Sequence, residues 1–88
     1  GKVACVAVVG NEDGAHHVCA EVFQALNDVG FTLAASGCTY WVGEAMHKTD
    51  YIDLKESPGK TATTTATLAA TTTHLARLLK GNAYPKLG

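Results

Sequence analysis

The sequence predicts an α/β fold in which two parallel strands alternate with two helices, in the order β-α-β-α. Three observations lead to this fold class. Residues 3–9 form an unbroken apolar run, residues 15–29 repeat their apolar side chains with a helical period, and an apolar run at residues 31–34 precedes a second helical segment. Strand, helix and strand joined by short loops form a βαβ unit, whose crossover is almost always right-handed.

The first predicted strand has the sequence VACVAVV, made of small and β-branched apolar residues. Its side chains do not alternate between apolar and polar, which is typical of a central strand in a parallel sheet with both faces buried. Two strands alone leave sheet edges and helix faces uncovered. We therefore expect the neighbouring strands to come from an N-terminal part of the domain or from another chain.

A turn and an amphipathic helix follow this strand. Residues 10–14, GNEDG, are turn formers, and Asn11 or Asp13 is predicted to cap the helix. Gly30 stands where a left-handed residue commonly ends a helix. The exposed stripe is predicted to contain His17, Glu21, Gln24 and Asp28, and the buried stripe Ala15, Val18, Val22, Ala25, Leu26 and Val29.

The second predicted strand is short and covers residues 31–34. Residues 35–57 are predicted to be a long irregular connection, which in a compact domain is usually functional or covers something. This connection carries the single tryptophan, Trp41, next to Tyr40. Two interpretations of Trp41 stay open: it roofs a site at the end of the second strand, or it packs the long loop or a subunit interface.

The last helix is predicted to begin at Ser57 and Pro58, with serine as the N-cap, and to end at Lys80 before Gly81. Its many threonines lower its intrinsic helix propensity, so it depends on tertiary packing. We expect a face of small residues to lie close against the sheet, flanked by leucines. This face would contain Ala62, Ala66, Ala69, Thr73 and Ala76, with Leu68, Leu75 and Leu79 beside it.

Composition excludes several classes of function. The chain has 88 residues, 47% of them hydrophobic, and a formal net charge of −1. It offers neither a basic patch for nucleic acid or anionic membranes nor an apolar segment long enough to span a bilayer. Its three cysteines fit no disulfide or zinc pattern, which predicts reduced thiols in a cytoplasmic protein. His16, His17 and Cys19 match no common zinc spacing either, so no metal site is predicted.

The turn after the first strand is the predicted binding site. In an open parallel sheet, ligands bind at the carboxyl ends of strands, where loops lead into helix N-termini. The spacing of Gly10 and Gly14 matches no phosphate-binding fingerprint, and Glu12 and Asp13 would repel a phosphate. Backbone N–H groups and imidazoles suit the polar edge of a neutral heteroaromatic ring better. The alternative is an ordinary strand-to-helix turn.

The segment GNEDGAHH, followed by FQALNDVGF, resembles the flavodoxin-like NADPH-dependent FMN reductase family. The resemblance extends from the family's fourth strand through its last helix and covers essentially the whole chain. It implies the C-terminal part, residues 1–88, of a single three-layer α/β/α domain whose N-terminal strands and phosphate loop lie outside this sequence. In the family, the loop after the fourth strand flanks the isoalloxazine ring. Residues that would contact the ring are Gly10, Asn11, Glu12, Asp13, Gly14 and His16, with His17 a weaker candidate.

The resemblance further implies that the full-length protein is a cytoplasmic, homo-oligomeric enzyme. It would transfer hydride from NAD(P)H to FMN and onward to a flavin, quinone or similar small acceptor, with no essential catalytic side chain. No nucleophile or carboxylate pair stands out in the sequence, which fits chemistry carried by a cofactor. By itself this chain is expected to be inactive. The alternative is a flavodoxin-like electron carrier or an α/β fragment without a ligand, which would oxidise NAD(P)H slowly or not at all.

Overall fold

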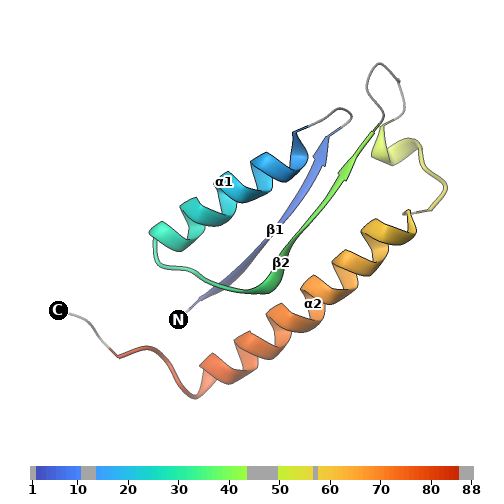
Figure 1. The fold of residues 1–88 in the computed structure, drawn as a ribbon. Coiled ribbons are helices and arrows are strands. Elements are labelled where there is room, and N and C mark those ends of the chain that lie inside the picture. The colour runs from blue at the N-terminus through green and yellow to red at the C-terminus, as the bar shows by residue number, and fades with distance from the viewer. Residues whose placement is uncertain (1, 11–13, 44–49, 57, 86–88) are drawn as a thin grey trace.

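A computed structural model describes residues 2–10, 14–43, 50–56 and 58–85 of the chain. Strand β1 (Val3–Gly10) is followed by helix α1 (Ala15–Asp28), strand β2 (Thr32–Val42), a short 3₁₀ helix η1 (Tyr51–Asp53) and helix α2 (Gly59–Lys80) (Figure 1). This order confirms the predicted β-α-β-α fold. Among the described residues, no helix is both long and apolar enough to cross a membrane.

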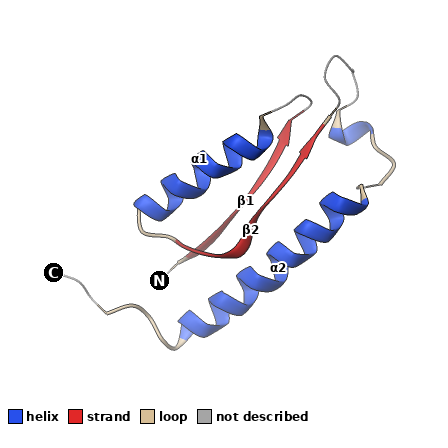
Figure 2. Cartoon of the chain, viewed as in Figure 1, coloured by secondary structure: helices blue, strands red, loops and turns tan. Residues whose placement is uncertain are grey.

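The two strands pair in parallel and form the middle of three layers (Figure 2). Helix α1 packs on both strands from one side, whereas α2 packs mainly against β2 from the other. Facing pairs in the register include Val8 with Tyr40 and Val9 with Trp41. Because paired residues of a parallel sheet point to the same face, Val8 and Tyr40 share one face, and Val9 and Trp41 share the other.

The burial of β1 differs from the prediction. We expected both of its faces to be buried, but in this chain only Val6 is fully buried and Val9 is 61% exposed. Cys5 and Ala7, on the same face as Val9, are exposed as well. The reason is the position of α2, which lies over β2 and leaves this face of β1 uncovered.

Strand β2 is much longer than predicted. It continues beyond Ala34 to Val42, so Tyr40 and Trp41 belong to the strand and not to an irregular connection. An irregularity interrupts the ladder, because Ala4 pairs with Leu33 whereas Val6 pairs with Cys38. The extra residues of β2 form a bulge at which Ser36 adopts a φ of 58°. After the bulge the strand resumes pairing and carries the aromatic residues to the carboxyl end of the sheet.

Helix α1 has its predicted length but turns a different stripe to the sheet. Its first residue is preceded by Gly14 as the N-cap, not by Asn11 or Asp13, which lie outside the described residues. Gly30, at a φ of 101°, has the predicted left-handed conformation. The buried and half-buried side chains are Ala15, Cys19, Phe23 and Leu26, while Val18, Val22, Ala25 and Val29 of the predicted stripe are exposed.

Helix α2 also presents an unexpected face. It ends at Lys80 as predicted, and Pro58 is its N-cap, while Ser57 lies outside the described residues. The predicted small-residue face of Ala62, Ala66, Ala69, Thr73 and Ala76 is exposed. Threonines and leucines lie against the sheet instead. The hydroxyls of Thr61 and Thr64 form hydrogen bonds to β2, whereas the buried hydroxyl of Thr72 has no partner among the described residues. This face contains Thr61, Thr64, Leu68, Thr71, Thr72, Leu75 and Leu79.

Candidate functional site

The carboxyl ends of β1 and β2 lie side by side and form the edge at which the predicted site stands (Figure 1). Gly10 is the last residue of β1, pairs with Val42, and accepts a hydrogen bond of 3.0 Å from the amide of Gly43. Gly14 starts α1 at a φ of 110°, a left-handed conformation that favours glycine, and its carbonyl accepts a 3.0 Å bond from Val18. The strand and the helix therefore fix both ends of the predicted loop.

Of the six predicted ring contacts, the structure describes Gly10, Gly14 and His16. The other three, Asn11, Glu12 and Asp13, lie outside the described residues. The predicted distinction between the two histidines has a structural counterpart. The exposed His16 ring stacks on Tyr40 of β2, with 5.5 Å between ring centroids and 23° between ring planes.

His17 points in a different direction and interacts within its own helix. Its Nε2 atom lies 3.1 Å from Oε1 of Glu21, one turn further along α1, and both side chains are exposed. An exposed pair at this spacing contributes only a few tenths of a kcal/mol, about 0.2–0.5. His17 therefore belongs to the outer face of α1, and His16 alone reaches the face that α1 shares with β2.

A cavity of about 450 Å³ opens beside Gly10 at the carboxyl edge. Its walls are formed by the ends of both strands and by η1, and its lining residues are Val9, Gly10, Trp41, Asp50, Tyr51 and Ile52. Its volume lies within the range of about 300–1,000 Å³ that is typical of small-molecule sites. Nothing in the sequence indicated that residues 50–52 lie beside Gly10, because only tertiary packing of η1 against Trp41 brings them there.

Aromatic rings form one wall of this cavity. Trp41 and Tyr51 meet edge to face, with 5.4 Å between centroids and 64° between planes. A reciprocal cap holds η1 in place: the side chain of Asp50 accepts a hydrogen bond from the amide of Asp53, and Oδ2 of Asp53 accepts one of 2.9 Å from the amide of Asp50. Trp41 thus lines the cavity and packs against the segment after β2, while its predicted role as the roof of a binding site stays a prediction.

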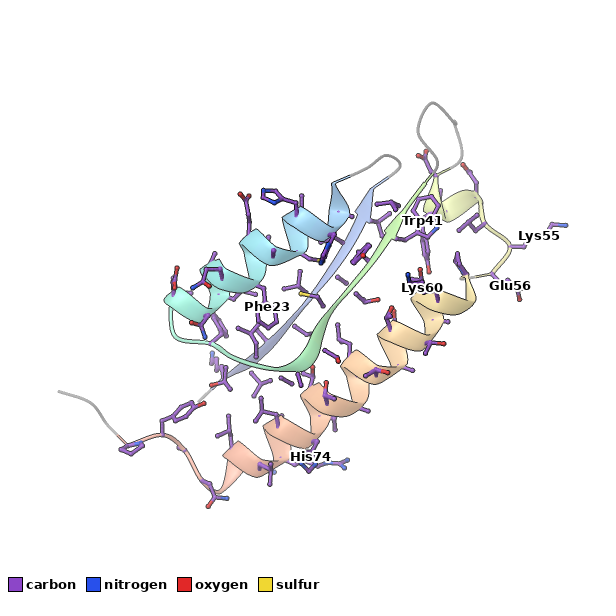
Figure 3. All side chains as sticks on the ribbon, in the orientation of Figure 1. Phe23, Trp41, Lys55, Glu56, Lys60 and His74 are labelled. Atoms are coloured by element: carbon purple, nitrogen blue, oxygen red, sulfur yellow. The ribbon has the colours of Figure 1, made fainter. Side chains whose placement is uncertain are left out.

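The other side of Trp41 faces a second cavity, of about 410 Å³, at the start of α2. Lys60 contributes to its rim, and Figure 3 shows Lys60 on the first turn of α2 near the carboxyl end of β2. Hydroxyl groups attach α2 to the strand here: Thr61 donates to the carbonyl of Tyr40 at 3.5 Å, and Thr39 bonds to Thr64 at 2.8 Å. These contacts hold β2, and with it Trp41, in position.

The site is aromatic and glycine-rich. In the described part of the chain, no three histidine, cysteine or acidic side chains come together as a metal-binding group. The polar groups that line the cavity are backbone groups, the indole N–H of Trp41, the hydroxyl of Tyr51 and the carboxylate of Asp50. His16 lies on the other face of the sheet, against Tyr40. Such a lining is suited to a planar aromatic ligand, which gains contact area from ring stacking and orientation from a few polar contacts.

Comparisons with known proteins point to flavin chemistry. No model of a known protein family matches the chain. A curated relative, 8-demethyl-8-aminoriboflavin-5'-phosphate synthase of Streptomyces davaonensis, is 37% identical over 84 residues, which cover 94% of this chain and 33% of the relative. The chain is therefore homologous to a flavin-related enzyme and spans about a third of its length.

A solved structure agrees with this relationship. The chain matches the crystal structure of RosB with bound 8-demethyl-8-formylriboflavin-5'-phosphate, with a TM-score of 0.85 and 37% identity. The match covers 94% of this chain and 33% of that chain. It confirms the predicted fold class, an α/β segment consistent with a flavodoxin-like domain. It does not confirm membership of the NADPH-dependent FMN reductase family, which stays a prediction.

Proposed function

We propose that this chain is the C-terminal part of a single flavodoxin-like domain that binds a flavin 5'-phosphate, and that the full-length protein is a flavin enzyme. The observation that carries the proposal is the cavity beside Gly10, walled by Trp41 and Tyr51, at the strand edge where α/β sheets bind ligands. Further support comes from the similar structure, whose bound ligand is a riboflavin 5'-phosphate derivative.

The proposed ring contacts are those predicted from the sequence. Gly10 and Gly14 would let the backbone approach the ring edge, because glycine has no side chain to block it. The imidazole of His16, held against Tyr40, would offer a hydrogen-bonding group at the start of α1. The phosphate would be bound elsewhere in the domain. The full set is Gly10, Asn11, Glu12, Asp13, Gly14 and His16.

In the reaction that we favour, bound FMN supplies hydride transfer between NAD(P)H and a small electron acceptor. The residues of this chain would bind and orient the ring and exclude water from one side of it. Trp41, packed against Tyr51, would provide a rigid apolar wall for this purpose. None of them would exchange a proton or form a covalent bond. We further propose that the full-length enzyme is a homo-oligomer.

A second candidate function is modification of the flavin itself. It is favoured by the name of the relative, a synthase whose product carries an amino group at position 8 of the ring system. In that case FMN would be the substrate rather than the resident cofactor. The same contacts to one edge of the ring would then orient position 8 toward groups contributed by other parts of the protein.

One experiment tests the proposal and separates these reactions. The full-length protein is mixed with FMN, its visible absorption spectrum is recorded, and NADPH is added in air while NADPH absorbance and flavin mass are followed. The reductase proposal predicts a perturbed flavin spectrum, sustained NADPH oxidation and an unchanged flavin mass. A changed flavin mass would instead support modification. A protein whose addition leaves the FMN spectrum unchanged would contradict flavin binding altogether, and slow NADPH oxidation with bound FMN would indicate an electron carrier.

A further inference from the structure

Two of the three cysteines meet between α1 and β2. Cys19 is buried, with 1% of its surface exposed, and Cys38 is half-buried. The Cys19 thiol lies 3.7 Å from the carbonyl of Thr39, and the Cys38 thiol lies 3.9 Å from the carbonyl of Cys19, so each side chain reaches the backbone beside the other. Both are free thiols, as is Cys5, which is exposed on β1.

A cavity of about 380 Å³ reaches this pair from the surface. Both cysteines line it, together with His16 and Gln24, whose side chains are exposed. A small oxidant such as hydrogen peroxide would fit easily into such a volume. The more exposed sulfur, that of Cys38, is then the first to be reached.

We propose that Cys19 and Cys38 form a reversible disulfide when hydrogen peroxide enters this cavity. The Cys38 thiolate attacks one peroxide oxygen, the O–O bond breaks, and a sulfenic acid forms while the other oxygen leaves as water. Cys19 then attacks the Cys38 sulfur, forms the S–S bond and expels the hydroxyl group as a second water. In total the two thiols lose two electrons and two protons, and one peroxide becomes two waters.

The environment of the two sulfurs assigns their order of reaction. Burial raises the pKa of the Cys19 thiol, and the adjacent Cys38 raises it further. Cys19 therefore stays protonated at neutral pH and is a poor first nucleophile, because the thiolate is the reactive form. Its contact with Cys38 nevertheless places it to attack once Cys38 is oxidised.

The disulfide would clamp α1 to β2 beside the candidate flavin site. His16 lies one helical turn before Cys19, and Tyr40 lies two residues after Cys38 on the same face of β2. The stacked pair of His16 and Tyr40 is thus the next contact along the same interface. An effect on the flavin would rest on the proposed function, whereas formation of the disulfide does not.

Peptide mapping of the full-length protein tests the proposal. The folded protein is treated with hydrogen peroxide, its remaining thiols are alkylated under denaturing conditions, and the unreduced digest is analysed by mass spectrometry. We expect a cross-linked pair of peptides joined through Cys19 and Cys38, lighter by two hydrogen masses than the two peptides together, and lost on treatment with dithiothreitol. Cys5→Ser is the matched control and should retain the cross-link, while Cys38→Ser should lose it.

Two results would overturn the inference. In one, peroxide converts Cys38 to sulfinic acid while Cys19 is recovered as the alkylated thiol. In the other, Cys19 and Cys38 are both recovered alkylated after Cys5 has been oxidised. Either result in the wild-type protein is decisive, so the test does not depend on the folding of a variant. FMN is absent from the assay, so a failure here would be distinct from a failure of the proposed function.

Discussion

Replacement of Gly37 by alanine tests the packing of the bulge in β2. Gly37 is buried and follows Ser36 directly. A Cβ atom at this position would lie 2.8 Å from the carbonyl oxygen of Ala34 and 3.2 Å from Cε2 of Phe23. Figure 3 shows Phe23 on the side of α1 that faces the strands. The closer of the two contacts is with backbone, so the bulge itself would have to move.

The expected cost follows from two opposing effects. A glycine-to-alanine change at a compatible position stabilises a protein by about 0.4–1 kcal/mol, because the unfolded chain loses freedom. Overpacking of a filled site costs about 1–3 kcal/mol. Because a contact of 2.8 Å with a backbone oxygen cannot be relieved by rotating a side chain, overpacking should win. We expect the free energy of unfolding to fall by about 1–2 kcal/mol.

Urea denaturation of the full-length protein measures this change. The matched control is Gly59→Ala at the start of α2, where a Cβ atom would meet no other atom within 4 Å. The control should unfold at the same urea concentration as the wild type or slightly above it, since alanine favours helix. A Gly37→Ala protein as stable as Gly59→Ala would refute the close packing of α1 on the bulge.

Two further changes probe the interfaces on either side of β2. Thr39→Val should lower the free energy of unfolding by about 1–3 kcal/mol, because the hydroxyl of buried Thr39 bonds to Thr64 at 2.8 Å and to Thr65 at 3.0 Å. The control, Thr67→Val at an exposed position, should have almost no effect. Equal urea midpoints for the two variants would contradict this assignment. Burial raises the pKa of the Cys19 thiol above its unfolded value of about 8.5. The neutral buried thiol therefore contributes its full stabilisation to the folded state below that pH, and this stabilisation is lost as the pH rises through the higher folded pKa. Melting temperatures should therefore fall more steeply above this pH in the wild type than in Cys19→Ala, and parallel curves would count against the burial.

Much of the fold could be predicted because local patterns agree with the final structure. The apolar run of β1, the helical period of α1 and the boundaries of α2 at Pro58 and Lys80 are all properties of consecutive residues. The length of β2 could not be predicted in the same way. Ser36 and Gly37 look like a turn in the sequence, and only pairing with β1 makes them a bulge within a continuous strand.

The predicted sheet-facing sides of α1 and α2 were wrong for a related reason. In α2, a face of small residues, mostly alanines, was expected at the sheet, yet the hydroxyl of Thr39 on β2 bonds to the hydroxyls of Thr64 and Thr65. At the candidate site, the position of the loop at the end of the first strand predicted where a ligand would bind, and the family resemblance supplied the individual contacts, among them Gly10, Gly14 and His16, which stay predictions. The sequence could not predict Tyr51, because its contact with Trp41 depends on the path of the chain after β2.

The affinity of the full-length protein for FMN tests the central claim most directly. Gly10→Val would place a branched side chain at the end of β1, in the wall of the cavity. If the loop binds the ring as proposed, two or three hydrogen bonds to the ring edge would be displaced, each worth about 0.5–1.5 kcal/mol. The matched control, Gly81→Val, makes the same change at the end of α2, where a Cβ atom meets nothing within 4 Å. FMN titrations, with melting temperatures recorded without flavin, should show at least roughly ten-fold weaker binding by Gly10→Val than by the control. Equal affinities would mean that this loop is only a turn and that the flavin ring is held elsewhere.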